Sequence, residues 1–163
     1  MFLFLINPAI IPFQKKTSFY HVHTCVYRCF VQKGSSIELQ SSITRENLRI
    51  LMTMFYEKAI EDEVLAPFFI DEIGDDLSSE DWFEHIDLLA DFWLAKMLGE
   101  DTYYGNFVGA HVKMPHLKRE TFTRWLELFS KTADEVYIAD IAEGFKKKGD
   151  QFAKQFLNTK KKI

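Results

Sequence analysis

The stretch Tyr104-Gly105-Asn106-Phe107-Val108-Gly109-Ala110-His111-Val112-Lys113-Met114-Pro115 decides how the rest of the chain is interpreted. It lies between two helical patterns, one that ends at Gly99 and one that begins near Lys118. Two glycines and a proline interrupt regular structure, so the sequence predicts a loop. Its other side chains are too apolar for a solvated loop. We therefore expect this loop to cover an apolar surface, with His111 in its middle.

Two interpretations of His111 are open on these residues alone. A lone histidine in apolar surroundings is most often a core residue whose ring is bonded to a backbone carbonyl. Alternatively, it is an axial ligand of a buried haem iron, with the apolar loop lying against the porphyrin.

The composition limits the classes of protein to consider. A chain of 163 residues predicts one domain with a single core. Its 16 Phe, 3 Trp and 6 Tyr suit either the lining of a large flat ligand or a helical core. The net charge of −4 gives no basic footprint for nucleic acid, and no stretch is apolar enough to cross a membrane. With only two cysteines, the default location is the reducing cytoplasm.

Residues 1–40 differ from the rest of the chain, which we expect to form the domain at 41–163. Met1 to Phe13 is apolar but has no positive residue ahead of it and contains two prolines, unlike a signal peptide. A possible zinc cluster has an unusual spacing and consists of His21, His23, Cys25 and Cys29. We expect a poorly ordered extension or a misassigned start, and not the functional site.

After residue 40, apolar residues recur with the period of a helix. Thr44 is the expected N-cap of the first helix, whose buried face includes Phe55 with Tyr56 at its edge. Three further helices are predicted: from Ser78 or Ser79 to Gly99, from about Lys118 to Tyr137, and from Ile138 through Phe156. Ser78-x-x-Asp81 resembles a capping box at the start of the second helix.

The segment Leu65–Ile70 is expected to be an apolar connector, too short for much structure, that ends near Gly74. His85 borders the apolar stripe of the second helix, and Trp125 lies on the inner face of the third. No alternating strand pattern appears after residue 40, so the predicted fold class is all-α.

Several chemistries are excluded by their missing motifs. The chain has no glycine-rich nucleotide loop, no Glu-x-x-His pair for a di-iron bundle, no His-Glu-x-x-His and no Cys-x-x-Cys-His for covalent haem. An aromatic helical core with histidines at its border remains, which is how a protein encloses a non-covalent haem.

The chain from about Ile43 to Leu157 resembles the truncated haemoglobins, and it is most similar to the third group of that family. The residues that carry the resemblance occur in the family's order: Phe55-Tyr56, Pro67-Phe68-Phe69, Trp82-x-x-His85, Phe92-Trp93, Tyr104-Gly105, His111 and Trp125-Leu126-x-Leu128-Phe129. The resemblance implies a two-over-two helical sandwich around haem b, which is iron protoporphyrin IX held without a covalent bond.

The resemblance also implies a role for individual residues. His111 would be the proximal iron ligand, and the competing His116 would be exposed or near a haem propionate. Tyr56, His85 and Trp125 would lie on the distal side, where the gas binds. The side chains expected to line the haem or its cavity are Phe69 (or Phe68 if the register slips by one), Leu89 and Trp93. Whether His85 itself binds iron without a ligand stays open.

The implied function is the binding of oxygen, nitric oxide and carbon monoxide at a polar distal pocket. Two donors, the Tyr56 hydroxyl and the Trp125 indole, would slow oxygen release and fit simple transport poorly. We therefore expect oxidation of nitric oxide to nitrate, or reduction of peroxide, with electrons from an external reductase. The alternative is a helical interaction module without haem, in which the aromatic residues are only core.

Overall fold

The computed structural model describes residues 38–112 and 118–160, and within these ranges the regular structure is helical. The helices are α2 (Arg45–Ala59), α3 (Ala66–Ile73), α4 (Glu80–Leu98), α5 (Phe107–Val112), α6 (Arg119–Val136) and α7 (Ala139–Lys160). The described residues contain one isolated bridge, between Gln40 and Tyr137, and no strand. The predicted all-α class is confirmed.

Local capping residues set the starts of α2 and α4 and the end of α4. Thr44 caps α2 reciprocally with Asn47: the Asn47 amide donates to the Thr44 hydroxyl at 3.3 Å, and the Thr44 amide donates to Asn47 Oδ1 at 2.9 Å. Ser79 is the N-cap of α4, so the predicted capping box at Ser78 is wrong. The Ser78 hydroxyl bonds Asp76 instead, at 2.6 Å. Gly99 ends α4 with a φ of 73°, a left-handed conformation that suits glycine.

Two segments predicted to lack regular structure are helical. The expected connector Leu65–Ile70 contributes to α3, because Pro67 falls in the first turn, where its missing N–H costs nothing. The expected loop around His111 contains α5, in which the Gly109 amide donates to Asn106 Oδ1 at 2.9 Å. Both helices are too short to show a period in the sequence.

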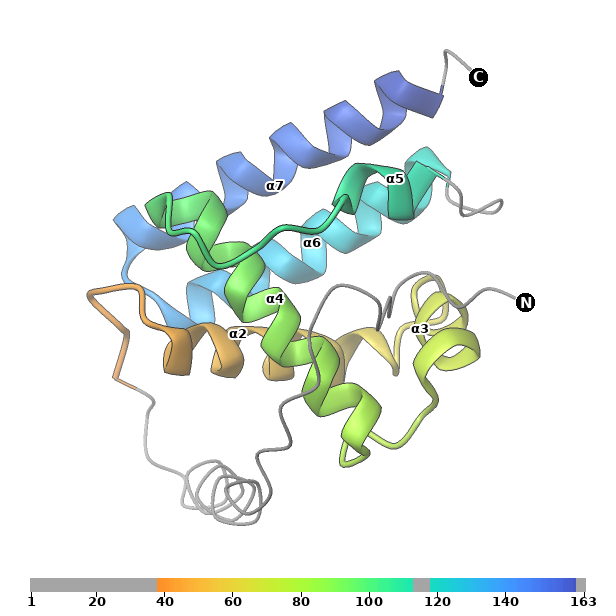
Figure 1. The fold of residues 1–163 in the computed structure, drawn as a ribbon, viewed down its shortest axis with the longest axis horizontal. Helices are drawn as coiled ribbons and strands as arrows, with labels where there is room; N and C mark the ends of the chain where they lie inside the picture. The colour runs from red at the N-terminus through yellow and green to blue at the C-terminus, as the bar shows by residue number, and fades with distance from the viewer. Residues whose placement is uncertain (1–37, 113–117, 161–163) are drawn as a thin grey trace.

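The helices form two packed pairs. In Figure 1, α2 and α4 cross in one layer, while α6 and α7 run side by side in the other. The layers meet where α2 packs on α6 and α4 packs on α7, and α5 lies against α7. This arrangement is the predicted two-over-two sandwich.

Aromatic rings fill the space between the layers. The ring of Trp93 stacks on Phe129 with 4.9 Å between centroids, and Trp125 stacks on the same phenylalanine at 4.7 Å. Phe145 of α7 meets Trp93 edge to face at 5.3 Å. Because these rings come from α4, α6 and α7, they join the two layers into one core.

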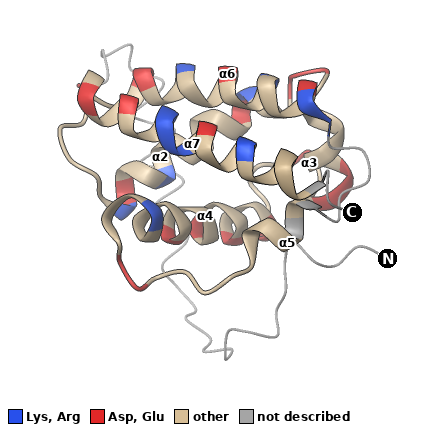
Figure 2. Ribbon diagram, turned by 90° about the horizontal axis from the view of Figure 1, so that it is seen from above, with Lys and Arg blue, Asp and Glu red and all other residues tan. Residues whose placement is uncertain are grey.

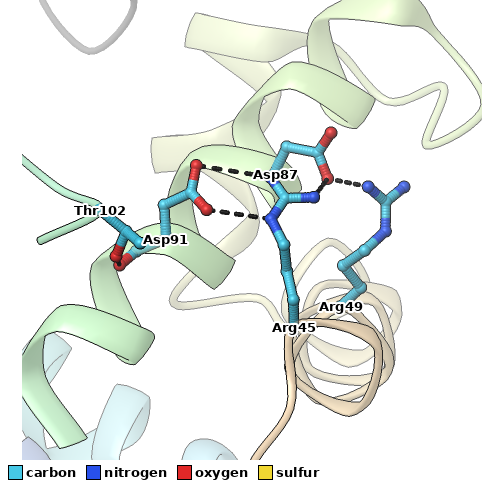
Figure 3. Close-up of polar contacts among 5 residues, drawn as sticks. All are labelled: Arg45, Arg49, Asp87, Asp91 and Thr102. Atoms are coloured by element: carbon cyan, nitrogen blue, oxygen red, sulfur yellow. Dashed lines mark hydrogen bonds and ion pairs between the residues drawn. The ribbon is translucent and has the colours of Figure 1, made fainter. Parts of the chain in front are cut away.

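A group of ion pairs fastens the start of α2 to the middle of α4 (Figure 3). Arg45 Nε lies 3.0 Å from Asp91 Oδ1, and its Nη1 lies 3.6 Å from Asp87 Oδ1. Arg49 also bonds Asp87. The Thr102 hydroxyl donates to the Asp91 carbonyl at 2.7 Å, so the chain that follows α4 joins the same group. These contacts join α4, which carries His85, to α2, which carries Tyr56.

Charge is distributed unevenly over the surface. Figure 2 shows acidic residues on α3 and both signs along α7. On α7, Lys154 pairs with Asp150 at 2.5 Å, one turn away, and Lys146 pairs with Asp134 of α6 at 2.6 Å. Such exposed pairs contribute little to stability.

None of the helices in the described residues has the length and apolarity needed to cross a membrane.

Candidate functional site

Tyr56 and His85 form a buried polar pair at the crossing of α2 and α4. The Tyr56 hydroxyl oxygen lies 2.8 Å from Nε2 of His85, and the two residues are only 4% and 7% exposed. The sequence left open whether Tyr56 would bond a backbone carbonyl. Its partner is the imidazole, twenty-nine residues away in the chain.

The His85 ring is held neutral by its surroundings. Burial, and then repulsion by His111 when that ring is protonated, lower the pKa of His85 to about 4. Nδ1 of this ring is buried, and no described residue supplies it with a hydrogen-bond partner. Since buried polar atoms are nearly always paired, an unpaired nitrogen at this place favours a site that receives a ligand.

Rings surround the Tyr56 side chain on three sides. Phe69 of α3 meets it edge to face at 5.1 Å, Trp82 of α4 lies at 4.8 Å, and Phe55 at 5.0 Å. Burial raises the pKa of Tyr56, so its hydroxyl keeps its proton at any physiological pH. Phe69 thus packs on Tyr56. Phe68, half-buried on the same helix, has no ring contact with Tyr56 in the described structure.

His111 is oriented by a bond within its own short helix. Its Nδ1 lies 2.7 Å from the carbonyl oxygen of Phe107, one turn earlier in α5. This is the bond that the core interpretation required, but histidines that bind metals are held by a carbonyl in the same way. With Nδ1–H donating to Phe107, Nε2 carries the lone pair and is available as a ligand. Burial lowers the pKa of His111, which keeps that nitrogen unprotonated.

Trp125 lies on the inner face of α6, between Phe129 and Phe55. Its ring centroid is 5.6 Å from that of Phe55, the neighbour of Tyr56. Gly149 of α7 faces it, and a Cβ added there would approach the Trp125 ring to 3.3 Å. A side chain at this position would therefore be a tight fit against α6. No hydrogen-bond acceptor is assigned to the indole N–H among the residues described.

The two remaining predicted lining residues lie further along α4. Trp93 is 2% exposed, and its ring packs on Phe129, Phe145 and Phe152. Leu89 is half-buried against the same core. Leu89 and Trp93 lie four and eight residues after His85, so the three residues share the inward-facing side of α4.

Several predicted residues lie outside the described ranges. These are His116 and the possible zinc cluster of His21, His23, Cys25 and Cys29. Most of the proposed extension at 1–40 is also outside them. Gln40, however, is tied to the domain: its amide donates to the Val136 carbonyl at 2.8 Å, and its carbonyl accepts from the Ile138 amide at 3.1 Å.

Three residues near the site were not predicted from the sequence. The Trp82 indole N–H donates to the Gly74 carbonyl at 2.9 Å and so ties α3 to α4. The Phe156 ring stacks on His111. Lys96 Nζ lies 5.3 Å from the centre of the Phe107 ring, over a group that includes Phe92 and Tyr103. Lys96 lies four residues after Phe92 in α4, so helical spacing could have indicated that contact. The stack of Phe156 on His111 joins distant parts of the chain and has no local signal.

A two-layer helical sandwich that carries a buried imidazole, His85, and a half-buried one, His111, is consistent with the arrangement of a haem globin. These residues fit a haem. His111 has Nε2 available to bind the iron, because its Nδ1 is bonded to Phe107. The buried Tyr56–His85 pair has polar atoms that could face a gas bound to the iron.

Comparison with known proteins agrees with this class. The chain is 33% identical over 117 residues to the group 3 truncated hemoglobin ctb of Campylobacter jejuni, covering 72% of this chain and 91% of that protein. The crystal structure of group III truncated hemoglobin from Campylobacter jejuni superimposes with a TM-score of 0.69 at 32% identity, over 75% of this chain and 94% of that one. No family model matches the chain. The chain belongs to the group 3 truncated haemoglobins, a family that implies a haem cofactor.

Proposed function

We propose that this protein holds haem b through His111 and binds diatomic gases beside Tyr56, His85 and Trp125. The observation that carries the proposal is the bond from His111 Nδ1 to the Phe107 carbonyl, which leaves Nε2 unprotonated and oriented. The remaining lining would come from Phe69 or Phe68, Leu89 and Trp93.

A bound haem supplies the iron at which oxygen, nitric oxide or carbon monoxide binds and through which electrons pass. The chain supplies the surroundings. Tyr56 and His85 keep polar hydrogens in a space from which Phe69 and Trp82 exclude water. In such a dry pocket a hydroxyl or imidazole donor acts more strongly on a polar ligand than it does in water.

Strong retention of oxygen suits its use in a reaction better than its transport. We therefore propose oxidation of nitric oxide to nitrate, or reduction of peroxide, in the cytoplasm with an external reductase as electron source. In this proposal, the Tyr56 hydroxyl is the proton-bearing group on the distal side, where the gas binds. Its raised pKa means that it donates a hydrogen bond without losing its proton.

Oxygen release and nitric oxide consumption test the proposal together. Replacing Tyr56 by Phe and Trp125 by Phe, singly and together, removes one or both donors while keeping the rings. We expect faster oxygen dissociation in each variant, and consumption of one equivalent of nitric oxide by the oxygenated wild type, with turnover when a reductase is added. Phe145→Leu, which alters the core away from Tyr56, is the control. Unchanged oxygen dissociation in the double variant would contradict the distal assignment, and reversible oxygen uptake without nitric oxide consumption would contradict the reaction.

A further inference from the structure

The ring of His111 has a second contact besides its hydrogen bond. Its face stacks on Phe156 of α7, with 4.5 Å between ring centroids and 20° between the planes. Phe156 in turn stacks on Phe122 of α6, at 5.5 Å and 22°. The three rings form a column. The helices α5 and α7 lie beside each other (Figure 1).

The column and the hydrogen bond constrain different motions. The bond from Nδ1 to the Phe107 carbonyl holds one edge of the imidazole, but small rotations about the Cα–Cβ and Cβ–Cγ bonds can still tilt the ring plane while that bond is kept. A flat ring against its face restricts this tilt. A nitrogen's lone pair lies in the plane of the imidazole, so a stack on the face leaves Nε2 free to bind a metal.

Phe156 is itself held firmly. It is 6% exposed, Phe122 covers it from α6, and the Phe107 ring meets it edge to face at 5.5 Å. Phe107 therefore supplies both the carbonyl that holds His111 and a ring that supports its stacking partner. The orientation of His111 depends on α5, α6 and α7 at once.

We propose that Phe156, supported by Phe122, is a positioning residue that fixes the plane of the His111 ring and so the direction of its Nε2. This proposal rests on the proposed function, because it concerns the same histidine. It assigns no contact between Phe156 and haem.

The test is the iron–histidine stretching band in the resonance Raman spectrum of the full-length, haem-loaded ferrous protein. A fixed ring gives one narrow band, and a ring free to rotate gives a distribution of orientations. We expect Phe156→Leu to broaden and shift the band, and Phe122→Leu to do so to a smaller extent. Phe156→Tyr keeps the ring face and should restore the wild-type band.

Phe145→Leu is the matched control, since Phe145 is a fully buried phenylalanine of the same helix that packs on Trp93 and Tyr137. It should lower stability and leave the band unchanged. A wild-type band in Phe156→Leu, or equal broadening in Phe145→Leu, would overturn the inference. If Phe156→Leu does not fold, the other two variants test the inference through the same band. Phe122→Leu should broaden the band and Phe156→Tyr should leave it as in the wild type; a wild-type band in Phe122→Leu would then overturn the inference. A wild-type protein without any band that depends on His111 would overturn the proposed function instead.

Discussion

The hydroxyl of Tyr56 lies 2.8 Å from Nε2 of His85, and the other ring nitrogen of His85 is buried without a partner among the described residues. One proton on the neutral imidazole can sit at either nitrogen. With the proton on Nδ1, the Tyr56 hydroxyl donates to Nε2, and only the Nδ1–H stays unpaired. With the proton on Nε2, the imidazole donates to the Tyr56 oxygen, and both the Nδ1 lone pair and the tyrosine's own hydrogen lack a partner among the described residues.

We accordingly predict that His85 in the haem-free protein is the tautomer with its proton on Nδ1, so that Nε2 accepts from the Tyr56 hydroxyl. Nitrogen-15 NMR of the imidazoles distinguishes the two tautomers by their chemical shifts, and His85→Gln assigns the signals. A proton on Nε2 would contradict the prediction, and would mean that His85 donates to the Tyr56 oxygen in the absence of a ligand.

Acid should destabilise the haem-free protein through the same histidine. The pKa of His85 is about 4 in the folded chain, below the ordinary value of 6.5, so the unfolded chain binds more protons between these values. The free energy of unfolding should therefore fall as the pH is lowered from about 6.5 towards about 4. Urea unfolding across this range measures the slope. His85→Gln, which does not titrate, should reduce it, and an unchanged slope would show that other groups are responsible.

A buried bond between Tyr137 and Asn47 should stabilise the start of α2. The Tyr137 hydroxyl, on a residue only 1% exposed, donates to Asn47 Oδ1 at 2.6 Å, and Asn47 Nδ2 donates to the Ser42 carbonyl at 2.9 Å. Tyr137→Phe should cost about 1 kcal/mol, and Asn47→Leu about 2–3 kcal/mol because it leaves the hydroxyl unpaired and removes the cap.

Tyr104→Phe is the control for this pair. Its hydroxyl also bonds a carbonyl, that of Asp101 at 3.1 Å, but the residue is 71% exposed. Denaturant unfolding should show a change within about 0.5 kcal/mol for this variant. An equal loss in Tyr104→Phe and Tyr137→Phe would refute the importance of burial.

The Arg45–Asp91 contact should contribute little energy despite its good geometry. The Arg45 side chain is 39% exposed, so water and salt screen the pair. A double-mutant cycle with Arg45→Gln and Asp91→Asn should give a coupling below about 1 kcal/mol that shrinks further in 1 M salt. A larger, salt-independent coupling would indicate that the group shown in Figure 3 acts as a cooperative network.

The sequence predicted the long helices well because their apolar residues repeat with a clear period. The cap at Thr44, the end at Gly99 and the start near Lys118 all have local chemical causes. It failed for α3 and α5, each too short to establish a period, and for the choice between Ser78 and Ser79, since both residues can cap.

The site could be predicted only in part. Amphipathic spacing placed His85 and Tyr56 at the edges of buried faces, but nothing in the spacing indicated that they bond each other across two helices. The stack of His111 on Phe156 joins residues 45 positions apart, and a histidine's stacking partner leaves no mark on the local pattern. Only the three-dimensional packing of α5 on α7 reveals it.

The most direct test of the central claim is the visible absorption spectrum of the protein expressed with haem, reduced under carbon monoxide. It should be compared for wild type, His111→Gly, and His111→Gly with added imidazole. We predict an intense carbonyl-haem Soret band in the wild type, its loss or displacement in His111→Gly, and its recovery with imidazole, which replaces the missing side chain. A colourless wild type, or a spectrum that does not change in His111→Gly, would contradict the claim that His111 holds the haem.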